Sequence, residues 1–206
     1  MHWRQVGRTL ISVVMVLAAT NATTAAPSAN DAPARRPNVL IWIMDDVGYG
    51  QTTPFGGPVD TPTLQSLADR GLRFTNFHST AICSSSRAAL LNGRNHHAVS
   101  MGNHAGLVSA DKGYTARIPA SAASLAQVLQ ANGYSTWALG KWDQFPNEDG
   151  TPNGPYTYWP SGQGFERFYG FLFADMDHFA PTLWRDHTPL DAPRDAGYHL
   201  TTDLAD

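Results

Sequence analysis

The sequence has almost no cysteine, since Cys83 is the only one among 206 residues. Structural cysteines in an oxidising compartment come in pairs, so an odd cysteine is either intermolecular or chemically special. Cys83 is followed by three serines and an arginine rather than by core residues, in the stretch "AICSSSRAALLNGR". The residues around Cys83 are therefore the first candidates for a functional site.

The sequence also lacks an excess of charge of either sign. The formal net charge is −3, and no long basic or acidic run occurs, so nothing points to a nucleic-acid partner. With 42% hydrophobic residues the chain can bury a core of one to one and a half domains. Eight histidines, six tryptophans and fourteen prolines indicate a folded chain with long, structured loops rather than disorder. No internal repeat is present.

No apolar run is long enough to span a bilayer well. The run Leu10–Ala19 follows the basic residues Arg4 and Arg8 and precedes small residues, which is the pattern of a secretory signal peptide. An uncleaved anchor or a buried helix is the alternative. We therefore expect export to the periplasm or beyond, with no stable membrane span after cleavage. The predicted parts are a signal peptide (1–26), a flexible linker (27–37) and a folded part (38–206).

The folded part alternates strand and helix signals. The run Asn38–Asp46 predicts a buried strand, and Thr61-Pro62 predicts the start of a helix that Gly71 ends. Further strands are expected at 72–79 and at 135–140, and further helices after Ser84 and within 119–134. This order predicts an α/β fold with a mostly parallel or mixed central sheet flanked by helices.

Polar residues stand where two of these strands end. Asp45 and Asp46 end the first predicted strand, and Lys141 ends a later one, so they are expected at the functional edge of the sheet. Adjacent carboxylates repel unless a cation or a proton intervenes, and hard oxygen ligands suit Ca²⁺ or Mg²⁺. The alternative is that one aspartate caps a turn while the other faces water.

The stretch around Cys83 predicts an anion site. A helix that begins here offers free N–H groups and the positive end of a dipole, and Arg87 adds a cation. A serine-capped surface helix with an incidental thiol is the alternative. A cysteine-dependent phosphatase of the Cys-x₅-Arg type is excluded because Ala89 occupies the arginine position.

Several motifs, in order, resemble those of the sulfatase family, in its arylsulfatase branch within the alkaline-phosphatase-like superfamily. They are "PNVLIWIMDDVGYG", "CSSSRAALLNGR", "ANGYSTWALGKW" and "GFERFYGF". The resemblance covers the chain from Pro37 onward. It implies the N-terminal part of the sulfatase catalytic domain.

The resemblance implies a sulfuric ester hydrolase in which a maturation enzyme converts Cys83 to formylglycine. One hydroxyl of the hydrated aldehyde, held by a divalent cation, attacks the sulfur, and the alcohol of the ester leaves. The second hydroxyl then loses its proton and expels sulfate by re-forming the aldehyde. The implied substrate is a sulfate-ester small molecule or a sulfated glycan. By position, the metal ligands are Asp45, Asp46 and Cys83, and the catalytic residues are Cys83, Arg87, Lys141 and Asp143. Lys141 is the sulfate-binding residue, and His97 is a further candidate for the surroundings of the substrate.

Three departures from the family pattern stand out. Ser85 occupies a position where the family prefers proline or alanine, and Asp143 stands where it usually has histidine. The resemblance also implies further metal ligands and a lysine beyond residue 206. Two alternatives therefore remain open: a phosphate or phosphonate ester hydrolase of the same superfamily, and a non-catalytic remnant that binds an anion or a sulfated glycan.

Overall fold

The computed structural model describes residues 36–191, 193 and 195–206. The predicted signal peptide (1–26) and all but the last two residues of the predicted linker lie outside this part of the chain. The chain divides into two units, Met1–Ile43 and Met44–Asp206. Among the described residues, no helix has both the length and the apolar character needed to cross a membrane.

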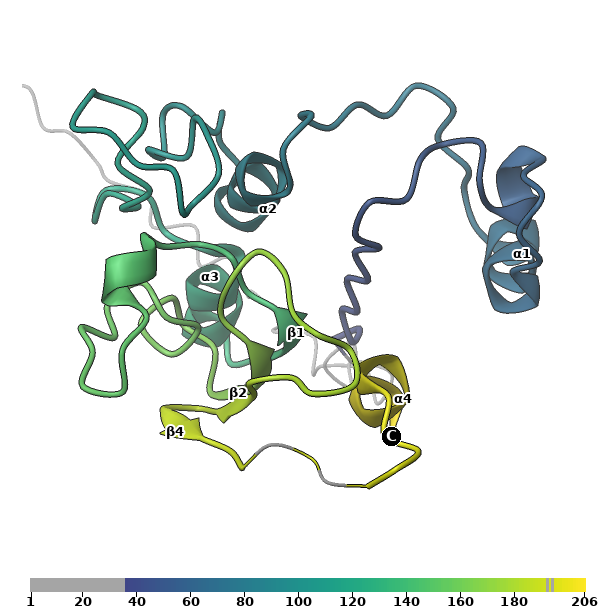
Figure 1. Cartoon of the computed structure of the whole chain (residues 1–206). Coiled ribbons are helices and arrows are strands. Elements are labelled where there is room, and N and C mark those ends of the chain that lie inside the picture. Colours follow the sequence, from purple (N-terminus) through teal and green to yellow (C-terminus); the bar gives the residue numbers. More distant parts are fainter. Residues whose placement is uncertain (1–35, 192, 194) are drawn as a thin grey trace, which may run out of the picture. The chain divides into compact units, whose positions relative to one another are not determined.

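All the secondary structure of the described chain lies in the second unit (Figure 1). Its helices and 3₁₀ turns are η1 (Thr53–Phe55), α1 (Pro62–Arg70), α2 (Cys83–Asn92), α3 (Leu125–Ala131), η2 (Asn147–Asp149) and α4 (Leu200–Ala205). Its strands are β1 (Trp137–Lys141), β2 (Arg167–Phe171), β3 (Trp184–Arg185) and β4 (Thr188–Pro189).

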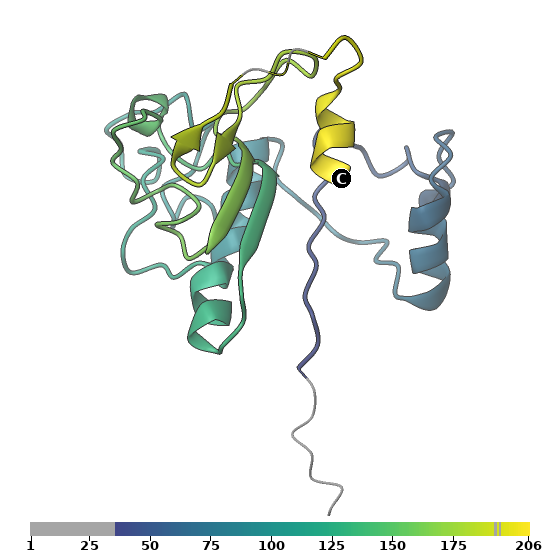
Figure 2. The ribbon, with the colours of Figure 1, turned by 90° about the horizontal axis from the view of Figure 1, so that it is seen from below.

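The strands form a mixed sheet in the order β1-β2-β3-β4. β1 and β2 run parallel, side by side in Figure 2, whereas β3 pairs antiparallel with both β2 and β4. Since α3 precedes β1 directly, the chain has the helix-to-strand succession of an α/β fold. The predicted α/β class with a mixed sheet is confirmed.

A glycine pair brings β1 and β2 close together just before Lys141. Gly140 lies opposite Gly170, and a Cβ on Gly170 would stand 2.0 Å from the carbonyl oxygen of Gly140. Both residues have positive φ, 84° and 153°. Glycine is therefore required at Gly170 by both the spacing and the backbone angle, and it is favoured at Gly140 by the backbone angle.

The predicted helix signals have clear structural counterparts. Pro62 starts α1 as expected. Ser124 caps α3 through a full capping box with Gln127, and Asn132 follows the last turn. Gly93 ends α2 in the left-handed conformation.

Two predicted strands are wrong. Residues 36–43 of the first unit are extended but in no sheet, and Leu40 and Trp42 are 90% and 67% exposed. In the second unit, Asp45 and Asp46 form a turn, and residues 72–79 also lack strand structure. An apolar run becomes a buried strand only when another strand pairs with its backbone and side chains cover it. Neither stretch has such pairing among the described residues.

Of the three buried hydrophobic clusters in the described part of the second unit, one is largely aromatic. Trp142, Phe145 and Trp159 belong to one buried cluster, in which the Phe145 and Trp159 rings stack 5.9 Å apart. The indole N–H of Trp159 donates to the carbonyl oxygen of Asp149 at 2.9 Å, so its polar atom is satisfied. These aromatic side chains therefore contribute to the packing of the second unit.

Candidate active site

The first turn of α2 carries Cys83. The helix begins at Cys83 itself, after Ile82 in the extended conformation, so the thiol lies at the end where backbone N–H groups are free. The serines that follow do not cap the helix in the usual way. Ser84 and Ser85 are completely buried, and Ser86 accepts a hydrogen bond from the backbone N–H of Thr80 at 3.1 Å.

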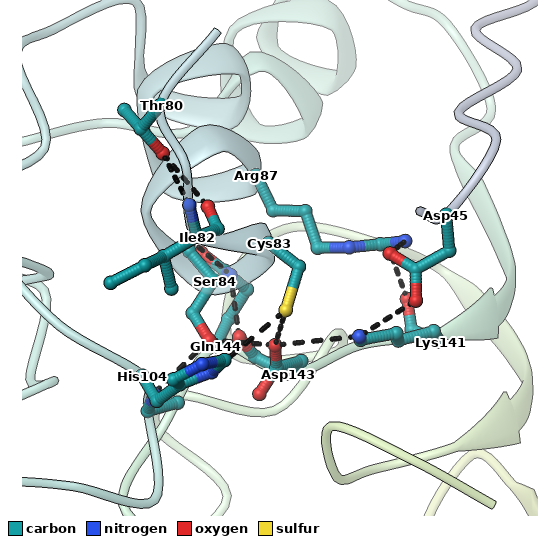
Figure 3. Close-up of polar contacts among 11 residues, drawn as sticks. Asp45, Thr80, Ile82, Cys83, Ser84, Arg87, His104, Lys141, Asp143 and Gln144 are labelled. Atoms are coloured by element: carbon teal, nitrogen blue, oxygen red, sulfur yellow. Dashed lines mark hydrogen bonds and ion pairs between the residues drawn. The ribbon is translucent and has the colours of Figure 1, made fainter. Parts of the chain in front are cut away.

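The chain beyond β1 brings Asp143 to this helix end (Figure 3). The backbone of Trp142 and Asp143 continues to bond to Phe171 and Leu172 beside β2, and Asp143 then adopts a φ of 54°. Its carboxylate is 2% exposed. Oδ2 accepts hydrogen bonds from the Ser84 hydroxyl at 2.6 Å and from the Cys83 thiol at 3.3 Å. A buried carboxylate with these two donors is a fixed partner of the Cys83 side chain.

Two cations and two carboxylates surround the thiol. Lys141 Nζ lies 2.8 Å from Asp45 and 3.9 Å from Asp143, and Arg87 Nη2 lies 3.2 Å from Asp45. The second terminal nitrogen of Arg87 donates to the carbonyl oxygen of Lys141 at 2.9 Å, which ties α2 to the end of β1. Figure 3 shows these groups on the same side of α2 as the sulfur.

These contacts shift two pKa values. Burial works to raise the pKa of the Asp45 carboxyl, but the hydrogen bond and charge of Lys141, with Arg87, outweigh it and lower that pKa. Burial works to lower the pKa of the Lys141 amine, but its hydrogen bonds with Asp45 and Cys83 and the charge of Asp143 raise it. Both groups are therefore charged at neutral pH, and the site has a fixed cation beside residue 83.

The described residues do not form a complete metal centre. Both Asp45 oxygens are engaged, one by Arg87 and one by Lys141, and Asp46 is an exposed turn residue with a φ of 56°. Across the described chain, no group of three or more histidine, cysteine, aspartate or glutamate side chains is placed to hold a metal ion. The oxygen chemistry of Asp45 suits a hard cation, but the ligand set does not fit one without further donors.

The predicted site residues thus divide into two sets. Asp45, Cys83, Arg87, Lys141 and Asp143 form one connected network of polar contacts. The contacts of the predicted substrate-binding residue His97 lie elsewhere. Its ring packs against those of His96 and Tyr114, at centroid distances of 4.2 Å and 5.2 Å, and is exposed.

The polar residues after β2 also find other partners. Asp177 accepts hydrogen bonds from the backbone N–H groups of Phe179 and Ala180, and the ring of His178 contacts that of His199 at the start of α4. These contacts order the 175–180 turn rather than the surroundings of Cys83.

Sequence reasoning missed three contributors. Ser84 bridges α2 and Asp143, Gln144 donates to the carbonyl oxygen of Ser84 at 3.0 Å, and His104 places Nδ1 3.9 Å from the Cys83 sulfur. The position of Ser84 next to the predicted nucleophile is a signal that could have indicated a role at the site, but a serine there also predicts the start of a helix. His104 had none, since eight histidines occur and only the folded loop selects this one.

Comparison with known proteins agrees with this geometry. The family model described as Sulfatase matches residues 37–206. Human arylsulfatase A is 40% identical over 146 residues, which are 69% of this chain and 27% of that protein. An arylsulfatase of Klebsiella aerogenes is 30% identical over 165 residues, 79% of this chain and 34% of that protein. An uncharacterized sulfatase of Schizosaccharomyces pombe is 33% identical over 156 residues, 72% of this chain and 27% of that protein.

Solved structures show the same fold. Ps i-CgsB, solved in complex with k-i-k-neocarrahexaose, has a TM-score of 0.55 at 24% identity, covering 78% of this chain and 38% of that one. A Bacteroides thetaiotaomicron protein, solved in connection with the metabolism of multiple glycosaminoglycans, has a TM-score of 0.53 at 25% identity, covering 71% and 30%. The chain thus spans about a third or less of the length of the three curated relatives. Because the family model matches from Pro37 to the last residue, the chain belongs to the sulfatase family.

Proposed function

We propose that the complete protein hydrolyses sulfate esters as an arylsulfatase-type enzyme, with residue 83 as its nucleophile. One observation carries the proposal. Residues from α2, from the end of β1 and from the turn at Asp45 join in one polar network that includes Cys83, although Asp45 and Lys141 are 96 positions apart. Such convergence of cations, carboxylates and a nucleophile is the arrangement of an active site.

In this proposal Cys83 is converted to formylglycine. The aldehyde, when hydrated, supplies an oxygen nucleophile in place of the thiol. The chain's own residues then hold and orient this group: the Asp143 carboxylate accepts a proton from it, and the α2 dipole favours negative charge beside it. Residue 83 and Asp143 are far apart in the sequence, but they meet because α2 carries the first and the chain leaving β1 carries the second.

Lys141 is the proposed sulfate-binding residue. Its charge is retained because Asp45, Cys83 and Asp143 raise its pKa, and its position 3.9 Å from Asp143 puts it at the nucleophile. An ammonium group at this position stabilises the negative charge on the sulfuryl oxygens while the ester bond breaks. Arg87 has a different role, because it holds the Asp45 carboxylate and the carbonyl oxygen of Lys141 and so fixes the site's frame.

For the divalent cation we propose Ca²⁺, with Mg²⁺ as the second choice. The support is the oxygen chemistry of Asp45 and Asp46, which suits hard cations. Because the described residues provide an incomplete ligand set, no step of the reaction is assigned to the metal. A metal titration of the complete protein, with Asp45→Asn as the matched variant, tests this: loss of stoichiometric binding in the variant supports it.

Mass spectrometry and substrate preference together test the function. The peptide Thr80–Arg87, taken from a host that carries the maturation enzyme, is expected to contain an aldehyde at position 83. The complete protein should then turn over an aryl sulfate faster than the matched aryl phosphate. A faster phosphate reaction would identify a phosphate or phosphonate ester hydrolase instead. An intact thiol with no turnover of either ester would support an anion-binding remnant.

We also propose that the protein is exported, since the sequence of residues 1–26 has the signal-peptide pattern. Sequencing the N-terminus of the mature protein tests this. A mature N-terminus between Ala22 and Ala26 agrees with export, and an N-terminus at Met1 contradicts it. The substrate proposed for an exported enzyme is a sulfate-ester small molecule or a sulfated glycan.

A further inference from the structure

The loop that follows α2 is attached to the nucleophile's own helix by two buried serines. The Ser85 hydroxyl donates to the carbonyl oxygen of Met101 at 2.7 Å, and the backbone N–H of Ala105 donates to the Ser84 hydroxyl at 3.1 Å. Met101 and Ala105 are themselves 0% and 1% exposed. Buried hydrogen bonds at both ends of a five-residue stretch prevent the loop from moving independently of α2.

This attached loop carries His104 to residue 83. The backbone N–H of His104 is held by Asn103 Oδ1 at 2.8 Å, and its carbonyl oxygen accepts from Leu107 at 2.9 Å. The imidazole then places Nδ1 3.9 Å from the Cys83 sulfur (Figure 3). Residue 83 therefore has two side-chain partners besides Lys141: the carboxylate of Asp143 and the ring of His104.

The one hydrogen of the Cys83 thiol gives Asp143 and His104 opposite hydrogen-bonding roles. A carboxylate only accepts, and the thiol has one hydrogen, so that hydrogen points to Asp143 Oδ2 at 3.3 Å. The sulfur can then meet His104 only as an acceptor, which puts a proton on Nδ1 of the ring. One partner receives a hydrogen bond from residue 83 and the other donates one to it.

We propose that His104 is a positioning residue for the nucleophile: together with Asp143 it holds the side chain of residue 83 in a single orientation. The inference rests on the proposed function, because a hydrated aldehyde has two hydroxyl groups in place of one thiol. One hydroxyl donates to Asp143 and the other accepts from Nδ1 of His104. The Asp143 carboxylate as acceptor and Nδ1 of His104 as donor lie on separate segments, so together they select one rotamer of residue 83. In that rotamer a hydroxyl faces Lys141 and the incoming ester.

Two substitutions of His104 distinguish the effect of its hydrogen bond to residue 83 from the effect of the volume of its ring. Asparagine puts an amide near the place of Nδ1, whereas leucine fills the space without a donor. In the complete protein, His104→Leu should lower kcat for an aryl sulfate about 10- to 100-fold with KM little changed, since misplacing a nucleophile by a fraction of an ångström costs that much. His104→Asn should stay within about threefold of the parent under the same argument. His78→Leu, at an exposed histidine, is the matched control and should leave kcat unchanged.

A second measurement does not depend on turnover. Crystal structures of the complete parent protein and of both variants should show one rotamer of residue 83 in the parent and in His104→Asn. His104→Leu should show two or more rotamers, whether position 83 is a cysteine or the hydrated aldehyde. Equal kcat in His104→Leu and the parent, or a single unchanged rotamer in His104→Leu, would overturn the role of His104. If the parent hydrolyses no sulfate ester, the proposed function fails, while the rotamer comparison still decides the role of His104.

Discussion

Two regions of this chain have similar apolar signals in sequence and opposite outcomes in structure. Around Cys83 and Asp143, side chains from α2 and from beyond β1 are largely buried, and Ser84 and Asp143 are paired, although Arg87 Nε and Gln144 Oε1 have no hydrogen-bond partner in the described part of the chain. Between residues 38 and 79, large apolar side chains such as Leu40, Leu72 and Phe77 are 90%, 84% and 76% exposed. The earlier stretch has no strand partner among the described residues, but pairing alone does not bury a side chain, because Trp137 and Leu139 of β1 are 68% and 63% exposed although β1 pairs with β2. Other side chains must also pack over the face concerned. Burial follows from the neighbour and not from the run itself.

The largest effect is expected on catalysis, for a substitution at Cys83 compared with one in the exposed 38–79 region. Cys83→Ala in the complete protein should lower aryl sulfate turnover at least about 10⁴-fold, because the nucleophile precursor is lost. Its thermal midpoint should change little, since Cys83 is half-buried and its sulfur has only long contacts. Leu72→Ala is the control in the exposed region and should leave turnover intact. Substantial turnover by Cys83→Ala would refute residue 83 as the nucleophile.

A pair of tryptophans tests the comparison through stability. Trp159 is 0% exposed and stacks in the aromatic core, so Trp159→Ala should lower the free energy of unfolding by about 3–5 kcal/mol. Trp42 is 67% exposed, and Trp42→Ala should cost less than about 0.5 kcal/mol. Urea titration followed by far-ultraviolet circular dichroism measures both. A cost at Trp42 as large as at Trp159 would show that the first region is covered in solution, and the comparison would break.

A pair of aspartates makes the same test for charge. Asp143→Ala leaves the Ser84 hydroxyl without its acceptor and Lys141 with one carboxylate fewer, which should cost about 2–3 kcal/mol. Asp46→Ala removes an exposed turn carboxylate and should stay within about 0.5 kcal/mol. Denaturant midpoints of the two variants, measured at neutral pH, give the difference. Equal costs would mean that Asp143 is not buried as described.

Local sequence signals reach only part of this structure. The helices α1 and α3 were predictable because their signals are local: Pro62 at a first position, and Ser124 with Gln127 as a capping box. The ordered motifs named Asp45, Cys83, Arg87, Lys141 and Asp143, which the structure joins in one network, but they also named Asp46 and His97, which the described structure places outside that network. Local signals do not say whether a partner strand exists, which is why the strand expected at 38–46 is wrong.

Other features required three-dimensional information from the start. Neither the short β3–β4 hairpin nor the six-residue α4 has a distinctive pattern. The contact between His104 and Cys83 joins residues 21 positions apart through a loop with no regular structure. Ser85 was expected only as a departure from the family signature, but its hydroxyl anchors that loop at Met101.

The smallest expected effect depends on pH and concerns how α4 is attached to the sheet. The hydroxyls of Tyr169 on β2 and of Tyr198 both donate to Asp203 of α4. Burial, reinforced by the bond to Asp203, raises the pKa of Tyr169 from 10.0 to about 12. A raised pKa means that the folded state holds the proton more tightly, so this stability is complete below pH 10 and disappears as pH rises through 12.

Tyr169→Phe should therefore cost about 1 kcal/mol at pH 8, the usual net value of one hydrogen bond. The difference from the parent should shrink as the pH approaches 12, where the parent loses the same bond by ionisation. Urea midpoints at pH 8 and pH 11 measure it, with Tyr49→Phe as the control because Tyr49 is 60% exposed. A difference that stays constant with pH would show that the Tyr169 proton is not held by α4. The attachment would then be packing of Leu200 and Leu204 alone.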